Sequence, residues 1–160
     1  MLMALFALIL QQFGIQATEE DFRRYEQQFR ERGHHIAADF HSTRGQGDKL
    51  FTPGLAYEYL VDREHHGYSF EVQGQMLGEL LDRNDKDWFV GAGMGYYPIR
   101  PVKVFATLGS QWFDGEAAPA ARVGVGYRFP FFNIAVMPNV YYQGDAENRH
   151  SWAIGARLQY

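Results

Sequence analysis

Hydrophobic and polar positions alternate along most of the chain after residue 33. In the last ten residues, SWAIGARLQY, every second side chain from Trp152 to Tyr160 is apolar or aromatic, and most of those between are small or polar. Successive side chains of a β-strand point to opposite faces, so this period of two indicates strands that each have one apolar face. We expect eight strands, at residues 34–43, 51–61, 67–77, 87–97, 101–113, 120–129, 131–143 and 149–160.

The segments between these strands differ in length and polarity. Short turns are expected at DREHH, around Pro101 and at Pro130. Short turns at one end and longer loops at the other are typical of an up-and-down barrel with an even number of strands. Each strand has about ten residues, which is the length that a tilted strand needs to cross a bilayer. The longer polar loops are expected around 44–50, 79–86, 114–119 and 144–148.

The two faces of these strands differ in charge and bulk. One face carries bulky apolar residues such as Tyr57, Val104 and Ile154, and no Asp, Glu, Lys or Arg falls on it. The other face carries glycines, amides and a few charges. The interior of an eight-stranded barrel is just wide enough for side chains to fill, and only the second set fits there. We therefore expect the apolar face to meet lipid, with a soluble calycin-like barrel that binds a small apolar ligand as the alternative.

The charged residues of the polar face divide by sign along the chain. The acidic ones come from the first three strands and the basic ones from the last four, and strands one and eight are neighbours in a closed barrel. Because a buried charge without a partner is costly, we expect a network of ion pairs that plugs the lumen, with Asp39 near Arg157 and with Glu58 and Glu71 near Arg122 or Arg128. A narrow, gated ion path is the alternative function. The predicted network consists of Asp39, Glu58, Glu71, Lys103, Arg122, Arg128 and Arg157.

Aromatic residues of the apolar face gather near the ends of the strands. Tyr and Trp prefer the two interfaces of a membrane, where they form girdles around β-barrels. The residues predicted to form these girdles are Tyr68, Trp88, Trp112, Phe129, Phe132, Tyr142, Trp152 and Tyr160.

The chain before residue 33 has a different pattern. Residues 1–17, MLMALFALILQQFGIQA, contain an apolar core of about ten residues followed by a small residue, which is typical of a secretory signal peptide. A packed or interfacial helix is the alternative. Residues 18–32 form a predicted amphipathic periplasmic helix, with Thr18 as its N-cap. Its aromatic side, with Phe22, Tyr25 and Phe29, suits either a cap on the domain or a helix at the membrane surface.

Composition narrows the class of protein. A chain of 160 residues suits one domain, here the barrel of residues 33–160, and a share of 16% aromatic residues beside 17 glycines suits strands better than helices. The net charge of −4 without a basic tract gives no support to nucleic-acid binding. The absence of cysteine excludes disulfides and thiolate metal sites, and we expect no cofactor. The predicted fold class is all-β: an eight-stranded antiparallel up-and-down transmembrane β-barrel with a short N-terminal helix.

The ending SWAIGARLQY resembles the C-terminal assembly signal of bacterial outer-membrane β-barrel proteins. The stretches WFVGAGMGYYP, ARVGVGYRF and FNIAVMPNVYYQG resemble strands of the small eight-stranded members, the group of the OmpA transmembrane domain, OmpX and OmpW. The resemblance covers about residues 34–160. It implies a place in the bacterial outer membrane, contact with its lipids and lipopolysaccharide, and insertion by the outer-membrane assembly machinery, which reads the last strand. We expect a monomer.

The expected activity is non-enzymatic: a structural, adhesion or interaction role in the cell envelope. Some barrels of this size are enzymes that modify the acyl chains of lipid A, and this is the alternative. Their chemistry needs a histidine that can act as base for a serine hydroxyl. His150 and Ser151 are adjacent and face opposite sides of their strand, while His41 and Ser42 stand beside the first loop. The sequence therefore favours the non-enzymatic role.

Overall fold

The computed structural model describes residues 19–44, 49–62, 67–77, 87–99, 101–113, 115–131 and 134–160. Within these ranges no helix is both long and apolar enough to cross a membrane. The elements are α2 (Glu19–Arg32), β1 (His34–Arg44), β2 (Lys49–Asp62), β3 (Gly67–Met76), β4 (Trp88–Ile99), β5 (Val102–Phe113), β6 (Glu116–Tyr127), β7 (Phe129–Phe131), β8 (Ile134–Asp145) and β9 (His150–Gln159).

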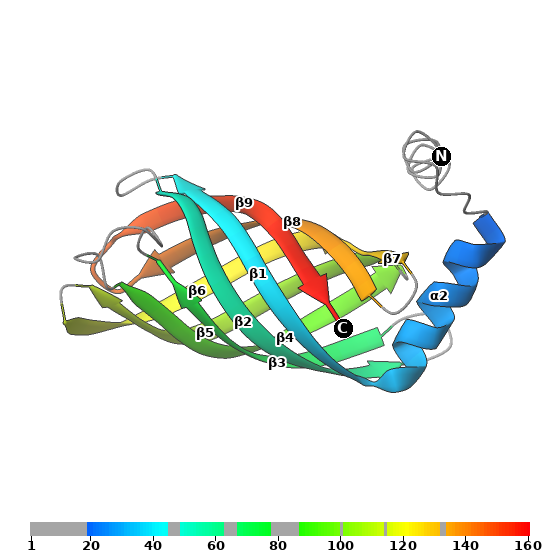
Figure 1. Ribbon diagram of the computed structural model, residues 1–160. Coiled ribbons are helices and arrows are strands. Elements are labelled where there is room, and N and C mark those ends of the chain that lie inside the picture. The colour runs from blue at the N-terminus through cyan, green and yellow to red at the C-terminus, as the bar shows by residue number, and fades with distance from the viewer. Residues whose placement is uncertain are drawn as a thin grey trace.

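The strands form a closed antiparallel barrel, which Figure 1 shows from the side. Each strand from β1 to β6 pairs with the next, β6 pairs with β8, β8 with β9, and β9 returns to β1. The short β7 extends β6, because Gly126 pairs with Asn139 and Phe129 pairs with Val136 in one continuous register. β6 and β7 therefore count as a single barrel strand. The predicted eight-stranded up-and-down barrel is confirmed.

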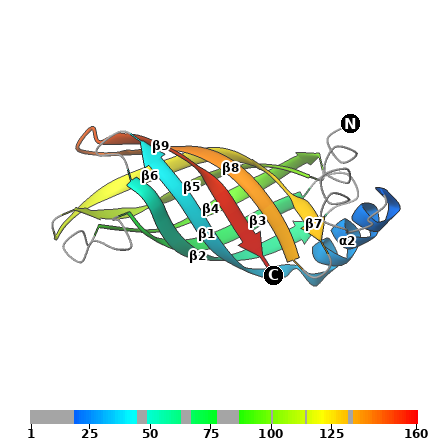
Figure 2. The ribbon, with the colours of Figure 1, turned by 45° about the horizontal axis from the view of Figure 1, so that its top comes forward.

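The two ends of the barrel differ. Helix α2 and the end of β9 lie at the same end, which we call the helix end (Figure 1). Figure 2 shows the helix beside β7 at this end, and α2 packs against β7 and β2. The opposite end, where β1 turns into β2 and β8 into β9, is called the loop end. Residues 18–32 were predicted as a helix, and α2 begins at Glu19 and ends at Arg32.

The apolar face of the strands lies on the outside of the barrel. Leu108 is 72% exposed and Ile154 68%, whereas Arg128 and Lys103 are fully buried in the lumen. The soluble barrel with an apolar interior is contradicted by this arrangement. We call the exposed outer residues the apolar belt, and its members include Ile36, Leu55, Val72, Met94, Leu108, Val123 and Ile154.

Glycines on the lumen side make room for the longer side chains of the opposite wall. A Cβ atom on Gly95 would overlap Cε of Lys103 and Oγ of Ser69, and one on Gly124 would overlap the ring of Phe105. The lumen is therefore packed with side chains, as expected for eight strands.

Two predicted connections are wrong. The loop expected around 114–119 is a tight turn, because Gly115 has a φ of 87° and Phe113 pairs with Glu116. β6 thus begins four residues before the predicted start at 120. The turn expected at Pro130 is also displaced, since Pro130 pairs with Ala135 inside the sheet. Pro119, which falls in the predicted loop, pairs with Ser110 inside the sheet as well.

Candidate functional site in the lumen

The helix half of the lumen is crossed by charged side chains. Glu58 on β2 and Glu71 on β3 are partners in the strand register, so their carboxylates lie side by side. Lys103 on β5 reaches across to both of them, with its Nζ 2.8 Å from Oε1 of Glu58 and 2.5 Å from Oε2 of Glu71. All three side chains are buried. One cation from the far wall therefore bridges two neighbouring carboxylates.

Arg157 joins the same network from β9. Its Nε and Nη2 donate to the two carboxylate oxygens of Asp39 at 2.7 and 3.0 Å, and its Nη1 donates to Oε2 of Glu71 at 2.9 Å. Asp39 and Arg157 are also register partners across the seam between β1 and β9. The sequence predicted this neighbourhood, and the structure places the two residues together. We call Asp39, Glu58, Glu71, Lys103 and Arg157 the lumen network.

Neutral side chains add hydrogen bonds to the network at Glu58. Tyr97 donates its hydroxyl to Oε1 of Glu58 at 3.0 Å, and Gln159 donates to Oε2 of the same carboxylate at 2.5 Å. The sequence analysis assigned Tyr97 to neither face of its strand. Tyr97 directly follows the outward-facing Tyr96, so the alternation of faces alone predicts that Tyr97 points into the lumen.

Arg128 lies at the helix end and has a partner that was not predicted. Instead of reaching Glu58 or Glu71, its Nη2 donates to Oε1 of Glu26 on helix α2 at 2.6 Å. Arg128 is fully buried, and its guanidinium stacks 4.7 Å above the ring of Tyr97. The predicted pairing of Arg128 with a carboxylate of the strands is therefore wrong, because a helix residue supplies the negative charge.

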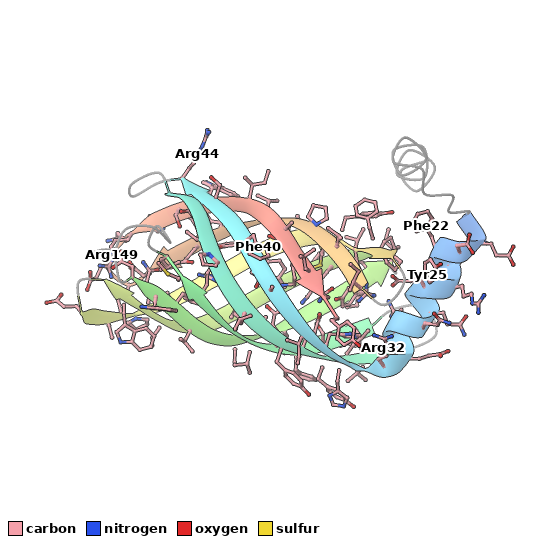
Figure 3. The ribbon with its side chains drawn as sticks, viewed as in Figure 1. Phe22, Tyr25, Arg32, Phe40, Arg44 and Arg149 are labelled. Carbon is pink, nitrogen blue, oxygen red and sulfur yellow. The ribbon has the colours of Figure 1, made fainter. Side chains whose placement is uncertain are left out.

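Helix α2 turns one side toward the barrel. Phe22, Glu26 and Arg30 are buried and lie at helical spacing, so they form the contact face. Tyr25, which Figure 3 labels beside Phe22, is half-buried, and the side chain of Phe29 lies outside the described residues. The guanidinium of Arg30 lies 5.7 Å above the ring of Tyr97. This arrangement favours the cap on the domain over a helix that lies free on a membrane.

Arg122 does not join the lumen network. Its Nε donates to Oε1 of Gln143 at 2.6 Å, and its guanidinium stacks 3.5 Å from the ring centre of Phe89 and 4.9 Å from that of Tyr141. The predicted pairing with Glu58 or Glu71 is wrong for this residue too. The register of β6 places Arg122 opposite Thr107 and Gln143, nearer to the loop end.

The rest of the loop half of the lumen is held by neutral hydrogen bonds. His41 and Asn139 meet at 2.7 Å between Nε2 and Oδ1, and Tyr141 donates its hydroxyl to Oε1 of Gln75 at 2.9 Å. Gln75 in turn donates to Oγ1 of Thr52 at 2.9 Å. The lumen thus has two parts, an ionic one at the helix end and a largely uncharged one at the loop end.

The predicted girdle residues fall into four groups. Tyr142 is half-buried, with its ring 4.9 Å from that of Trp152. Phe129 is only 9% exposed and lies on β7, the strand that α2 packs against, so it does not face lipid freely. Phe132 lies outside the described residues. The remaining ones are exposed on the outer face: Tyr68, Trp88, Trp112, Trp152 and Tyr160.

The two histidines beside the candidate serines, His41 and His150, lie on opposite sides of the barrel wall. His150 points outward with Trp152 and stacks on Tyr142, with ring centres 5.6 Å apart, while His41 is buried inside the lumen. Among the described residues, no three His, Asp or Glu side chains gather as metal ligands.

No protein-family model matches the chain, and no curated protein matches its sequence. Several solved structures are similar to it at low identity. The crystal structure of Ail, the attachment invasion locus protein of Yersinia pestis, has 16% identity and a TM-score of 0.47, and the match covers 79% of this chain and 96% of that one. Neisserial surface protein A has 16% identity, a TM-score of 0.45 and the same coverage. A de novo designed transmembrane β-barrel has 15% identity and a TM-score of 0.43, with 80% and 96% covered.

The type of barrel follows from the strand pairing and the distribution of side chains. Closure leaves no unpaired sheet edge in the barrel, which hydrocarbon requires because it offers no hydrogen bonds. The apolar belt faces outward and the charges face inward. Eight antiparallel strands with these two properties are the architecture of small bacterial outer-membrane proteins. The chain is a transmembrane β-barrel of this type.

Proposed function

We propose that this chain is a non-conducting, non-enzymatic protein of the bacterial outer membrane, with a structural or interaction role at the cell surface. The observation that carries the proposal is the lumen network, in which side chains from β1, β2, β3, β5 and β9 meet across the barrel. The lumen of such a barrel is filled with side chains. Its lumen offers no route for solutes, so its function must lie on its outer surface or at its loop end.

Two layers support a sealed lumen. The first is the lumen network, where every carboxylate has at least one cation within 3.0 Å. The second is helix α2, whose Glu26 neutralises Arg128 at the helix end. Buried charges that are paired in this way are costly to separate, because each would be left alone in a medium of low polarity. A path for ions would require both layers to open.

The loop end supports the interaction role. Arg44 is exposed at the end of β1 and projects away from the barrel in Figure 3. The β8–β9 turn is ordered by Arg149, which is 2.5 Å from Oδ2 of Asp145 and 3.1 Å from Oε2 of Glu147. A rigid turn on a rigid barrel presents a fixed surface to a partner. Lipids and lipopolysaccharide would contact the apolar belt, and β9 would carry the signal for the assembly machinery.

A measurement of ion current tests the sealed lumen. In planar lipid bilayers the intact protein is expected to produce no conductance steps, because the lumen network and α2 leave no continuous water path. A large porin reconstituted under the same conditions serves as the positive control, and a shift in gel mobility between unheated and boiled samples shows that the protein is folded. Regular steps that depend on the concentration of this protein would contradict the proposal and favour the gated ion path.

A further inference from the structure

The outer wall of the barrel is hollowed on one side. An open hollow of about 270 Å³ crosses β6, β8 and β9. Its walls are formed by side chains at outward positions of these strands: Val125, Tyr127, Pro138, Val140 and Ile154. An empty space against hydrocarbon loses dispersion contacts on both of its sides, so a membrane fills it. Because the walls are almost entirely apolar and lie within the apolar belt, the occupant that fits them is an acyl chain.

The hollow lies directly beside the aromatic residues of the loop end. Val140 pairs with Ile154 across β8 and β9, and the next outward pair toward the loop end is Tyr142 with Trp152. The rings of these two residues are 4.9 Å apart. Tyr and Trp on a membrane barrel lie at the level of the lipid head groups. An acyl chain in the hollow therefore descends from a head group at the loop end.

An arginine faces outward at the same level. Arg44 is the register partner of Trp152 across β1 and β9, and both side chains are exposed. Figure 3 shows Arg44 projecting away from the barrel. Within the ranges that the structure describes, no carboxylate forms an ion pair with it. A guanidinium at head-group level, next to an aromatic ring, is suited to bind a phosphate through two parallel hydrogen bonds.

The separation of Arg44 from the hollow indicates the kind of lipid. Arg44 is on β1 and the middle of the hollow is on β8, two strands away, so the two lie roughly 10 Å apart around the wall. A glycerophospholipid has one small head group directly above its two chains. Lipid A, the lipid part of lipopolysaccharide, has a phosphorylated disaccharide that bears several chains side by side. Only the wider molecule places a phosphate at Arg44 and a chain in the hollow together.

We propose that this surface is a binding site for one lipid A molecule, in which Arg44 binds a phosphate of the disaccharide and the hollow holds one acyl chain. The inference rests on the proposed function, because it needs the loop end at the cell surface, where lipopolysaccharide forms the outer leaflet. The long connection between Met76 and Trp88 at this end agrees with that orientation. The proposal deepens the interaction role by naming a partner and its place on the barrel.

Native mass spectrometry of the protein in detergent tests the site with purified lipid A that carries two phosphates and six acyl chains. We expect one molecule to bind, about tenfold more tightly than phosphatidylglycerol. Arg44→Gln removes the phosphate contact and Val140→Phe fills the hollow, and each is expected to weaken the binding of lipid A about tenfold. Lipid A stripped of both phosphates is expected to bind the intact protein as weakly as diphosphorylated lipid A binds Arg44→Gln.

Matched controls exist for both substitutions. Arg149→Gln removes a loop-end arginine that is already held by Asp145 and Glu147, and Leu108→Phe enlarges an exposed residue of the apolar belt on β5, outside the hollow. Both are expected to bind lipid A like the intact protein. The shift in gel mobility between unheated and boiled samples shows that each variant is folded.

Three results would overturn the proposal: equal binding of lipid A and phosphatidylglycerol, unchanged binding of lipid A by Arg44→Gln or by Val140→Phe, and a dimer of the intact protein that Val140→Phe abolishes. The last result would show that a second copy of the chain fills the hollow. If a variant does not fold, the comparison of lipid A with and without phosphates on the intact protein still decides. Failure here leaves the sealed lumen untouched, because that claim is tested separately by ion current.

Discussion

Replacing Lys103 with methionine is expected to lower the free energy of unfolding by about 3–5 kcal/mol. Glu58 and Glu71 face each other across β2 and β3, and both are buried. Lys103 is the cation that lies within 2.8 Å of both carboxylates. Without it, two like charges remain side by side in the lumen, and only Glu71 keeps a second cation partner, Arg157. Equilibrium unfolding by urea in lipid vesicles, followed by tryptophan fluorescence, measures the loss.

A triple variant separates charge from packing in this experiment. Lys103→Met combined with Glu58→Gln and Glu71→Gln removes the charges together, and we expect most of the stability to return, because replacing a whole buried ionic group is often nearly neutral. Arg149→Met is the matched control at the loop end, where a partly exposed ion pair is worth about 1 kcal/mol or less. A stability of Lys103→Met close to that of the intact protein would contradict a buried bridge between the two carboxylates.

Replacing Arg157 with methionine is expected to cost about 3–5 kcal/mol as well, because Asp39 is then buried without a cation. Both oxygens of Asp39 accept from Arg157, at 2.7 and 3.0 Å. The pair also joins the first and last strands of the barrel, where the sheet closes. The expected result is a lower temperature at which the folded band disappears in unheated gel electrophoresis.

A double-mutant cycle isolates the Asp39–Arg157 contact. Asp39→Asn alone leaves Arg157 with Glu71 as its partner and is expected to cost less than Arg157→Met. The double variant is expected to be more stable than the sum of the single effects predicts, with a coupling of about 1–3 kcal/mol. Additive effects would show that the two side chains do not interact in the folded barrel, and would place Arg157 elsewhere in the lumen.

The orientation of the barrel wall was predictable because it depends only on a period of two. Each outward residue is followed by an inward one along most of the strands, so one correct assignment, such as Ile154 outside, fixes the rest of β9. The volume of the lumen then decided between the two possible orientations, because the apolar set is too bulky for eight strands. The same reasoning predicts from the sequence alone that Asp39, Lys103 and Arg157 face the lumen.

The partners of the lumen charges were less predictable. Alternation tells which face a side chain occupies, but the height and angle at which side chains cross the lumen depend on the register of all eight strands. Asp39 and Arg157 could be paired because their strands are neighbours. Arg122 and Arg128 could not, since one lies nearer to the loop end and the other meets Glu26, a residue of a helix whose docking no periodicity reveals.

The two wrongly predicted connections, the loop at 114–119 and the turn at Pro130, have causes in their own stretches of sequence. The dipeptide Asp-Gly before Glu116 is a common hairpin signal, but the polar run that contains it suggested a longer loop. Pro119 falls in the predicted loop 114–119, and Pro130 is the predicted turn between two strands. Both are paired within the barrel, with Ser110 and Ala135. The observed strand ends therefore differ from the predicted ones, while the inward and outward faces of these strands are as predicted.

The apolar belt is expected to contact lipid, and one measurement on the protein without any substitution tests this contact. In methyl-labelled protein in lipid nanodiscs, nuclear Overhauser effects report which methyl groups lie beside acyl chains. Leu108 is 72% exposed on the outer face and Leu60 is 3% exposed in the lumen, so the two leucines form a matched pair. We predict transfer from acyl chains to Leu108, Val123 and Ile154 and none to Leu60. Transfer to Leu60, with the belt methyl groups in contact with water, would contradict the account.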